Sequence, residues 1–383
     1  MVLEHNYPPD IRVEKEIRSL LNAGHQILLA CATRTGSGGE EEVDSLTIIR
    51  KRMSTFIYKS SVGCLKFPFY FNFWRKFLKK ILLTHTVDAL HIHDLPLAKL
   101  AWEIKKNKGI PFVLDCHENY PYMLESSAHT QTFLGRLLSS TKQWLKYEKM
   151  MLRYADVVFT VIDEQKDRFL KMGLDEQKVF IVSNTPELLE IETDNRKDAD
   201  FVFVYAGNVY GSKGMEVMIK GFKVAADNIP QAKLWIVGDI KKWNDRYQVI
   251  NKEDESLIKC WGWQTLDNLY RLIAQADAAL LPHLKNRNSD FVIPNKLFQY
   301  MMAGKPVIAS NCNPIQRILK ETEAGLIYRF DDYQDLADKM TKLYQDRHNI
   351  RAMGEKGKKA VFKKYNWSAA EKELLTAYNK LLA

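Results

Sequence analysis

Residues 290–312 read Asp-Phe-Val-Ile-Pro-Asn-Lys-Leu-Phe-Gln-Tyr-Met-Met-Ala-Gly-Lys-Pro-Val-Ile-Ala-Ser-Asn-Cys. Pro294 suits the first turn of a helix, because the N–H that proline lacks would have no partner there. Apolar residues follow at helical spacing until Gly304, which favours the left-handed conformation that ends a helix, and Pro306 prevents continuation. The apolar run after Pro306 is typical of a buried strand. The stretch therefore predicts a loop, a short helix, a glycine stop and a strand.

The start of this predicted helix is suited to binding an anion. Asn295 and Lys296 lie in its first turn, where free backbone N–H groups and a partial positive charge are joined by a lysine. We therefore expect a phosphate or diphosphate to bind there. Gln299, one turn further, could direct its amide towards the sugar hydroxyls of a bound nucleotide. The alternative is a core helix and strand without a ligand, as any α/β domain contains.

The stretch resembles the signature of the retaining, group 1 (family 4) glycosyltransferases of the GT-B fold, in the branch that reads Pro-Asn-Lys-Leu-Phe-Glu-Tyr-Met-Ala-x-Gly-Lys-Pro-Val-Ile. Two acidic positions differ. The family's ribose-binding Glu is Gln299 here, and its first Glu falls on Phe291, beside Asp290. The resemblance implies a donor site for a nucleoside diphosphate sugar. Its residues in this stretch would be Asp290, Asn295, Lys296 and Gln299.

The length of 383 residues exceeds that of one typical core and predicts two domains. Hydrophobic residues make up 46% and charged residues 27%, which indicates a globular chain rather than a disordered or membrane-spanning one. The five cysteines are scattered without metal or disulfide spacing, which favours a reducing cytoplasm. We expect no signal peptide, and no apolar run reaches the roughly 18 residues that span a bilayer.

Strand-like and helix-like segments alternate in two successive sets. This predicts an α/β protein with two Rossmann-like, doubly wound domains facing a cleft, the GT-B arrangement. We expect an N-terminal domain over 1–187, a charged linker over 188–200 and a C-terminal domain over 201–365. The resemblance implies that the first domain holds the acceptor, that the second holds the donor, and that a last helix over 366–383 crosses back. Residues 131–155 read as one long basic amphipathic helix.

A glycine-punctuated turn follows the first predicted strand of the second domain. It covers residues 207–214 and ends in Lys213-Gly214. Glycines let a backbone approach a phosphate closely, and a lysine at a helix start neutralises it. The turn resembles the family's Gly-Arg-x-x-x-x-Lys-Gly loop, with Asn208 in place of the Arg. The resemblance implies donor contacts from Gly207, Asn208 and Lys213, the last matching the diphosphate-binding lysine.

Two predicted strands of the first domain, 88–93 and 111–116, each lead into a histidine and a carboxylate. The residues are His93, Asp94, His117 and Glu118. Ligands of open parallel sheets bind at the carboxyl ends of the strands, so two such pairs favour a functional role for these side chains. The family resemblance implies that they line the cleft near the reacting sugar. Both stretches resemble the family, and His117 matches the histidine thought to contact the donor sugar near the anomeric carbon.

The segment Pro-Pro-Asp-x-Arg-Val before the first predicted helix resembles the family's opening loop, which faces donor and acceptor. Asp10 and Arg12 match this motif. Asp10 equally suits a helix cap and Arg12 a charge on the helix surface, so both readings stay open. The polar, glycine-rich segment 33–43 has no Gly-x-Gly-x-x-Gly pattern and is expected to be a surface loop.

The net charge of +9 is concentrated in one region. Residues 45–87 contain nine Lys or Arg and no Asp or Glu, and within them residues 67–83 mix aromatic and basic side chains. This composition suits an anionic membrane surface, a core helix with a solvated basic face, or stacking on single-stranded nucleic acid. We favour the membrane surface, and no nucleic-acid motif supports the last reading.

Together these features predict a retaining, metal-independent glycosyltransferase that moves a sugar from a nucleoside diphosphate sugar to a hydroxyl. A glycan or lipid-linked acceptor, in surface polysaccharide or glycolipid assembly, would place it in the cytoplasm, peripherally at the inner membrane face. No cofactor and no Asp-x-Asp metal site are expected. The expected catalytic residues are His117, Lys213 and Lys296, with positive charge stabilising the leaving diphosphate. The expected cleft or acceptor residues are Asp10, His93, Asp94, His117 and Glu118.

Three alternatives stay open. Asn208, Phe291 and Gln299 are compatible with a weakly active or inactive protein that binds a nucleotide sugar or a partner, although a neutral Gln still hydrogen-bonds a ribose. A nucleotide-sugar 2-epimerase of similar fold would convert the sugar without an acceptor. A nucleic-acid-binding protein rests on charge alone, and its binding would depend steeply on salt.

Overall fold

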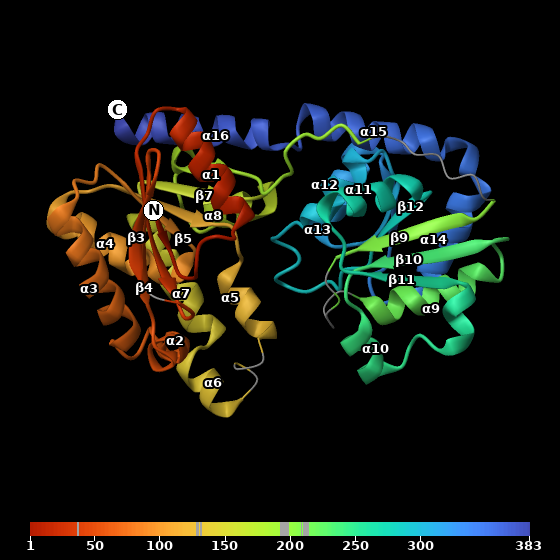
Figure 1. The fold of residues 1–383 in the computed structure, drawn as a ribbon, viewed down its shortest axis with the longest axis horizontal. Coiled ribbons are helices and arrows are strands. Elements are labelled where there is room, and N and C mark those ends of the chain that lie inside the picture. Colours follow the sequence, from red (N-terminus) through yellow and green to blue (C-terminus); the bar gives the residue numbers. More distant parts are fainter. Residues whose placement is uncertain (37, 128–129, 131, 192–198, 208, 210–213) are drawn as a thin grey trace. The chain divides into compact units, whose positions relative to one another are not determined.

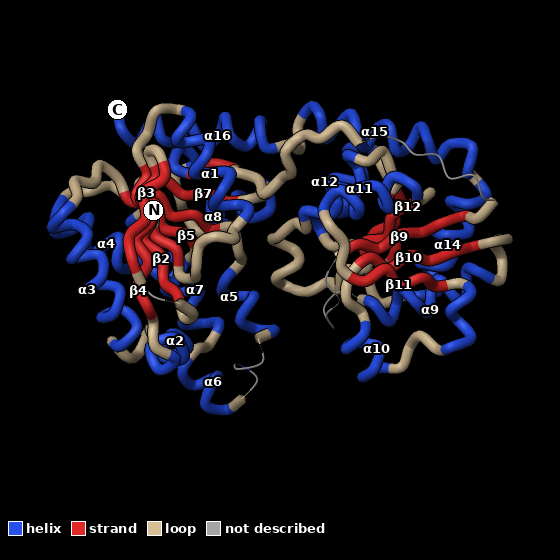
Figure 2. The backbone as a smooth tube through the Cα atoms, in the orientation of Figure 1, coloured by secondary structure: helices blue, strands red, loops and turns tan. Residues whose placement is uncertain are grey.

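The computed structural model describes two compact units. Unit 1 comprises Met1–Asn184 with Ala370–Ala383, and unit 2 comprises Thr185–Ala369. Each is built around one sheet with helices packed against it (Figures 1 and 2). The structure describes all residues except 37, 128–129, 131, 192–198, 208 and 210–213.

The sheet of unit 1 has the strand order β3-β4-β2-β1-β5-β6-β7-β8. Its neighbours pair in parallel except β3, which runs antiparallel to β4. The strands are β1 (Val2–Leu3), β2 (Ile27–Thr33), β3 (Gly39–Val43), β4 (Leu46–Arg52), β5 (Leu90–His93), β6 (Phe112–Cys116), β7 (Val157–Thr160) and β8 (Val179–Ile181). The inner strands β5, β6 and β7 are fully buried, as expected where helices cover both faces of a parallel sheet, although β5 contains His91 and His93 and β6 contains Asp115.

The helices of unit 1 supply most of the large side chains of its core, including Trp74 and Trp144. They are α1 (Ile11–Asn22), α2 (Thr55–Ser60), α3 (Phe69–Thr84), α4 (Ala98–Lys108), α5 (Tyr120–Met123), α6 (Phe133–Leu138), α7 (Thr141–Tyr154), α8 (Asp163–Lys171) and α16 (Trp367–Leu382). From Ala370 onwards α16 belongs to unit 1.

Unit 2 has a six-stranded parallel sheet in the order β11-β10-β9-β12-β13-β14. Its strands are β9 (Phe201–Ala206), β10 (Ala232–Val237), β11 (Ile258–Gly262), β12 (Ala278–Leu281), β13 (Val307–Ser310) and β14 (Gly325–Tyr328). Its helices are α9 (Met215–Ala226), α10 (Lys241–Tyr247), α11 (Leu266–Gln275), α12 (Asn295–Met302), α13 (Asn313–Thr322), α14 (Tyr333–Gln345) and α15 (Ile350–Lys363).

Both sheets are doubly wound, and each has a point where the strand order reverses. In unit 1 the chain moves from β1 to β2 on one side and later to β5 on the other. In unit 2 it moves from β9 to β10 on one side and later to β12 on the other. Open α/β sheets bind ligands outside the carboxyl ends of their strands at such a switch point. The fold therefore marks the β1–β5 edge and the β9–β12 edge as candidate sites.

The stretch 290–312 forms the elements that its sequence predicts. Pro294 occupies the N-cap position, α12 begins at the next residue, and β13 follows. Gly304 ends the helix in the left-handed region with φ of +68°. The Tyr300 hydroxyl on α12 accepts a hydrogen bond from the backbone N–H of Ala206 at 2.8 Å. This hydrogen bond holds α12 against the end of β9, which lies at the switch point.

The prediction of one helix over 131–155 was wrong. The chain forms α6 and α7 instead, with a break between them. Ser140 and Gln143 form a capping box in which each side chain accepts a hydrogen bond from the other residue's backbone N–H. This local pairing starts α7 afresh, because the cap satisfies N–H groups that a continuous helix would otherwise bond to the preceding turn.

The prediction of a loop over 33–43 was also wrong at its end. Residues 39–43 form β3, an exposed edge strand with three consecutive glutamates, antiparallel to β4. Arg50 Nη1 on β4 donates to Glu41 Oε2 at 2.6 Å. Exposed charges along an edge strand discourage pairing with other chains, so a strand of this composition gives no apolar signal in the sequence.

The aromatic and basic segment 67–83 forms α3, and most of its rings lie in the core. The buried side chains are Tyr70, Phe71, Trp74, Phe77, Leu78 and Ile81. The lysines at 76, 79 and 80 are exposed. The helix α3 therefore fits the alternative of a core helix with a solvated basic face. Its buried aromatic rings are not available to contact a membrane surface, which was the alternative that we favoured.

The divisions between the units fall after Asn184 and after Ala369, near the expected ends at 187 and 365. The expected linker, 188–200, includes residues 192–198, which lie outside the described residues. Among the helices that the structure describes, none is long and apolar enough to cross a bilayer.

Candidate functional site

The carboxyl edge of the unit 1 sheet brings together ionisable side chains from three strand ends. Glu4 follows β1, Asp94 follows β5 and His117 follows β6. Asp94 is not a glycine, yet its φ is +69°, in the left-handed region that such residues rarely adopt. Its backbone N–H donates to the carbonyl of Asp115 at 3.0 Å, which holds this conformation in place. Strained residues of this kind are concentrated at functional sites.

His117 lies between two carboxylates. Its Nδ1 is 3.0 Å from Asp115 Oδ2, and its Nε2 is 3.4 Å from Asp94 Oδ2. Burial alone lowers the pKa of this imidazole, but the two negative charges outweigh burial and raise the pKa of His117 to about 10. The ring is therefore a cation at neutral pH and can stabilise negative charge on a neighbouring group.

Arg12 is not the helix-surface charge that one of its two readings assumed. Its side chain is 4% exposed, and its Nε and Nη2 donate to the two carboxylate oxygens of Asp115 at 3.1 and 2.9 Å. Its Nη1 donates to the carbonyl of Val182 at 3.0 Å. Burial alone would raise the pKa of Asp115, but Arg12 and then His117 hold it well below its usual range. Arg12 thus keeps Asp115 ionised beside His117.

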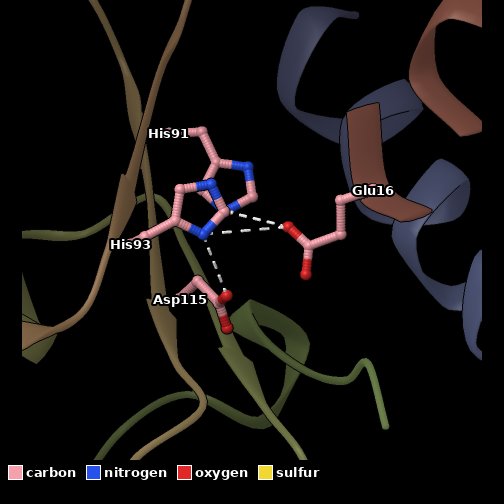
Figure 3. A group of neighbouring side chains, drawn as sticks. All are labelled: Glu16, His91, His93 and Asp115. Carbon is pink, nitrogen blue, oxygen red and sulfur yellow. Dashed lines mark hydrogen bonds and ion pairs between the residues drawn. The ribbon is translucent and has the colours of Figure 1, made fainter. Parts of the chain in front are cut away.

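A buried cluster lies behind this edge (Figure 3). Glu16 of α1 points towards the stacked rings of His91 and His93 on β5, whose centroids are 4.3 Å apart. Glu16 Oε1 is 3.0 Å from Arg12 Nη2, and Glu16 Oε2 is 3.6 Å from His91 Nε2. Burial raises the pKa of Glu16 and lowers that of His91 well below its usual value. His93 Nδ1 is 3.4 Å from Asp115 Oδ2.

Glu16, His91, His93 and Asp115 are residue types that bind metal ions, and their potential ligand atoms lie within 4.8 Å of one another. However, the Arg12 guanidinium already contacts both carboxylates, at 3.0 and 2.9 Å. A divalent ion among these atoms would be repelled by that fixed charge, because the site is buried and poorly screened. We therefore interpret the cluster as an ion-pair network in which arginine is the cation.

Two further carboxylates at this edge have displaced pKa values. Burial raises the pKa of Glu4 to about 7, although a hydrogen bond from the Tyr70 hydroxyl opposes the shift. Asp10 is the N-cap of α1, and its Oδ2 is 3.0 Å from His5 Nε2. Burial alone would raise the pKa of Asp10, but the contact with His5 and the backbone N–H of α1 lower it to about 2.

Only some of the predicted site residues of unit 1 lie together at the edge of the sheet. Asp94 and His117 lie together at the edge, and Asp10 caps the adjacent helix. Glu118 is exposed, whereas His93 has no exposed surface and lies against Asp115.

Sequence reasoning missed Glu4, Glu16 and Asp115. Glu4 had a signal that could have been used, because it directly follows the apolar residues Val2 and Leu3, which form β1. The burial of Glu16 against His91 and of Asp115 against Arg12 could not be predicted, because these partners lie far apart in the sequence.

The switch point of unit 2 holds Lys296, in the first turn of α12. Its Nζ is 3.2 Å from the Tyr205 hydroxyl and 4.3 Å from the centre of the Tyr205 ring. It crosses beside Gly207, where a Cβ atom would lie 2.6 Å from the ammonium nitrogen. Gly207 also has φ of +127°, a conformation that side chains disfavour. A glycine at the end of β9 is therefore required for the lysine to occupy this position.

Three other predicted donor residues surround this lysine in sequence. Asn295 Oδ1 is buried without a hydrogen-bond partner among the described residues. Gln299 Nε2 is 3.5 Å from the Tyr270 hydroxyl on α11. Asp290 Oδ1 accepts a hydrogen bond from the backbone N–H of Asn313 at 3.2 Å, at the start of α13. Asp290 therefore has a structural contact of its own, while the Asn295 amide oxygen has no partner among the residues that the structure describes.

The predicted donor residues Asn208 and Lys213 lie outside the described residues. The two ends of their turn are fixed. Gly207 N–H donates to the carbonyl of Val237 at 2.8 Å. Gly214 has φ of +62°, and a Cβ atom there would lie 1.9 Å from the carbonyl oxygen of Pro282, just after β12. Gly207 and Gly214 therefore both lie at the β9–β12 switch point.

Replacing Arg12 by Met should destabilise the protein by about 3–5 kcal/mol, because two buried carboxylates lose their cation. The measurement is the free energy of unfolding in urea. The matched control is Arg75→Met, since Arg75 makes a bidentate pair with Glu103 that is 35% and 25% exposed. That change should cost under about 1 kcal/mol. Equal losses in the two variants would contradict the role that we assign to Arg12.

Replacing His117 by Gln should change how stability depends on pH. The folded-state pKa of about 10 exceeds the ordinary value of 6.5, so the stabilisation is complete below pH 6.5 and is lost as the pH rises through 10. The difference in unfolding free energy between wild type and variant should therefore shrink over that range, by an amount on the order of a few kcal/mol. The exposed His348, changed to Gln, is the control for losing an imidazole. A difference that stays constant with pH would contradict the assignment.

Comparison with known families matches both units of the chain. The model described as Glycosyltransferase Family 4 matches residues 12–185, and the model described as Glycosyl transferases group 1 matches residues 200–346. The first range contains the Arg12–Asp115 edge, and the second contains Lys296 and α12.

Among curated proteins, the capsular polysaccharide biosynthesis glycosyltransferase CapM of Staphylococcus aureus is 23% identical over 262 residues, which cover 61% of this chain and 64% of CapM. The UDP-Gal:alpha-D-GlcNAc-diphosphoundecaprenol alpha-1,3-galactosyltransferase of Escherichia coli is 21% identical over 287 residues, covering 70% of each chain.

Among solved structures, HepE of Anabaena in complex with UDP superposes with a TM-score of 0.69 at 14% identity and covers 99% of both chains. At this identity the likeness concerns the fold, and it agrees with the two doubly wound sheets described above. The chain belongs to the group 1, family 4 glycosyltransferases and has their GT-B fold.

Proposed function

We propose that this glycosyltransferase takes its sugar from a nucleoside diphosphate sugar and adds it, with retention, to a hydroxyl of a lipid-linked glycan. The name of the E. coli relative specifies a UDP-galactose donor and a diphosphoundecaprenol-linked acceptor. The name of CapM specifies capsular polysaccharide biosynthesis. These relatives support a role in surface polysaccharide or glycolipid assembly, and the structure of HepE with UDP supports UDP as the first nucleotide to test.

The observation that carries the proposal is the position of Lys296. It lies in the first turn of α12, at the carboxyl edge of a parallel sheet and at its switch point. Helix N-terminus, lysine ammonium and the glycine that makes room for it converge there, which is the combination that binds a diphosphate. The Asn295 amide oxygen, buried without a partner in the described structure, adds a polar group able to meet a ligand donor.

The proposed reaction needs positive charge where the diphosphate departs. The bond between the anomeric carbon and the diphosphate oxygen breaks, and a bond from that carbon to the acceptor oxygen forms on the same face. The acceptor proton passes to a departing phosphate oxygen. Lys296 and the α12 N-terminus, with Lys213, would stabilise the charge that develops. Because these groups supply it, we propose that the reaction is metal-independent.

We propose that His117 contacts the donor sugar and that the unit 1 edge receives the acceptor. Its imidazolium, oriented by Asp115, can hydrogen-bond a sugar oxygen or stabilise negative charge on the leaving group. Asp94, in its strained conformation, borders the same edge and can accept a hydrogen bond from an acceptor hydroxyl.

A second candidate function, favoured by one observation, is nucleotide-sugar binding with weak or no transfer. Gln299 replaces the family's ribose-binding Glu, and its amide approaches the Tyr270 hydroxyl at 3.5 Å. A carboxylate would accept ribose hydroxyls more strongly than an amide does, because hydrogen bonds to charged groups are stronger. The change Gln299→Glu separates these functions, since it should strengthen nucleotide binding in either one but raise transfer only in an active enzyme.

A lipid-linked acceptor would be reached from the inner face of the membrane. We therefore propose a peripheral position there, with unit 1 facing the lipid because the acceptor edge belongs to that unit. The basic region 45–87 supports this position through its charge.

A thermal-shift panel of UDP, GDP, ADP, CMP and their sugar conjugates tests the donor site. One nucleotide should raise the melting temperature selectively, since a ligand at about 100 times its Kd adds about 2.7 kcal/mol of stability. EDTA should not remove the shift if binding is metal-independent. Lys296→Ala should weaken binding about tenfold or more, because a charged hydrogen-bonding group is lost.

The control variant is Lys359→Ala, an exposed lysine on α15 of the same unit, which should leave the shift unchanged. Absence of a shift with every nucleotide at millimolar concentration would contradict the proposed donor. Loss of the shift in EDTA would contradict metal independence alone.

A further inference from the structure

Unit 1 carries a cluster of exposed apolar side chains that neither the core nor the proposed site uses. We call it the α2–α6 patch. Its members, with exposed fractions, are Phe56 (63%), Phe67 (47%), Phe69 (46%), Phe133 (83%) and Leu137 (55%). Single exposed apolar residues are ordinary on a protein surface, but several large ones together indicate an interaction site.

Contacts join these residues into one surface although they come from two distant segments. The rings of Phe56 and Phe69 have centroids 5.6 Å apart, and those of Phe67 and Phe69 are 6.3 Å apart. Lys66 Nζ donates to the carbonyl of Leu137 at 2.5 Å, which ties the loop before α3 to α6. In Figure 1, α2 and α6 lie at the same end of unit 1.

The two sequence segments that supply the patch carry charges of one sign only. Residues 53–69 and 130–147, which supply the patch and its surroundings, contain five basic residues and no Asp or Glu. The basic residues are Lys59, Lys66, Arg136, Lys142 and Lys146. Aromatic side chains with a basic, acid-free surround are the composition that binds the headgroup layer of an anionic bilayer.

A hollow of about 400 Å³ in the same unit is lined by residues of α3, α4 and α7 and by Leu65, which precedes Lys66. Leu65 and Phe71, which flank patch residues in sequence, form part of its wall. Lys99 and Lys146 also line it, and no carboxylate does. The two lysine ammonium groups suit the anionic phosphate of a phospholipid, and the apolar side chains that line the hollow suit its acyl chains.

We propose that the α2–α6 patch docks unit 1 on an anionic lipid bilayer. The exposed rings enter the headgroup layer, and the surrounding lysines and arginine meet lipid phosphates. This inference rests on the proposed function in one respect, namely that the enzyme acts at a membrane. A second copy of the chain is disfavoured as the occupant, because a two-fold contact would bring five basic residues against the same five.

The test is co-sedimentation with vesicles of phosphatidylcholine, with and without phosphatidylglycerol. Wild type should bind only the anionic vesicles, and less at high salt. The double variant Phe133→Ser, Leu137→Ser should lower the partition coefficient at least about tenfold, because two exposed apolar side chains no longer enter the bilayer. The double variant Lys59→Glu, Arg136→Glu should also lower it about tenfold or more, since each basic residue contributes about fivefold near an anionic surface.

The matched control is Leu83→Ser, Lys80→Glu. These are an exposed apolar residue, 74% accessible, and an exposed lysine at the far end of α3. The control should bind within about twofold of wild type, because neither side chain belongs to the patch. Failure of wild type to bind anionic vesicles, or a loss of binding in the control that equals the loss in the patch variants, would overturn the proposal.

The same preparations are tested for nucleotide-induced thermal shift without vesicles. A normal shift with no vesicle binding would refute the docking surface and leave the donor site standing. Normal vesicle binding with no shift would support the docking surface and contradict the proposed donor. Salt-sensitive binding to a single-stranded oligonucleotide, without binding to vesicles, would also overturn the proposal.

Discussion

The Arg12 guanidinium, buried among carboxylates, is the interaction on which the unit 1 site depends. It donates two hydrogen bonds to Asp115 and one to the chain at Val182, and it contacts Glu16 on its own helix. Without this cation, burial would favour neutral carboxyl groups. Asp115 would then no longer hold His117 as an imidazolium. One arginine thus joins α1, the end of β6 and the segment after β8, and it fixes the charge presented at the sheet edge.

The two units carry different functional groups at the same place in their folds, the point where the strand order of the sheet reverses. Each has a parallel sheet whose strand order reverses once, and each has its polar residues at that reversal. In unit 1 the edge carries Asp94 and the imidazolium of His117, which we propose hydrogen-bond sugar hydroxyls. In unit 2 it carries Lys296 and a helix N-terminus, which we propose bind a diphosphate. This division agrees with a family whose members move a sugar between a nucleotide and a hydroxyl.

The helices and strands that could be predicted best from the amino-acid sequence are those whose ends are set by neighbouring residues. Pro294, Gly304 and the apolar run after Pro306 act over neighbouring residues, and the helix and strand that they predict are present. Local signals also predicted that Asp10 could cap a helix. The two-domain α/β architecture followed from the alternation of strands and helices, because that alternation extends along the whole chain.

Long-range contacts could not be predicted in this way. Arg12 and Asp115 lie 103 positions apart, so nothing near Arg12 distinguishes a buried ion pair from a surface charge. The aromatic residues of α3 gave an amphipathic signal, but only packing decides which rings are buried. The exposed patch depends on Leu137 of α6 lying beside Lys66, and no periodicity connects those two regions. The break before α7 had a local signal in Ser140 and Gln143, which a reading by amphipathic period overlooked.

The most direct test of the central claim is analysis of the transfer product. The protein would be incubated with the nucleotide sugar that binds it and with a polyprenyl-diphosphate-linked sugar, and the product examined by mass spectrometry and proton NMR. The account predicts one added sugar, attached with the anomeric configuration that it had in the donor, and no such product from the Lys296→Ala variant. An inverted linkage, an epimerised sugar formed without acceptor, or free sugar as the sole product would contradict it.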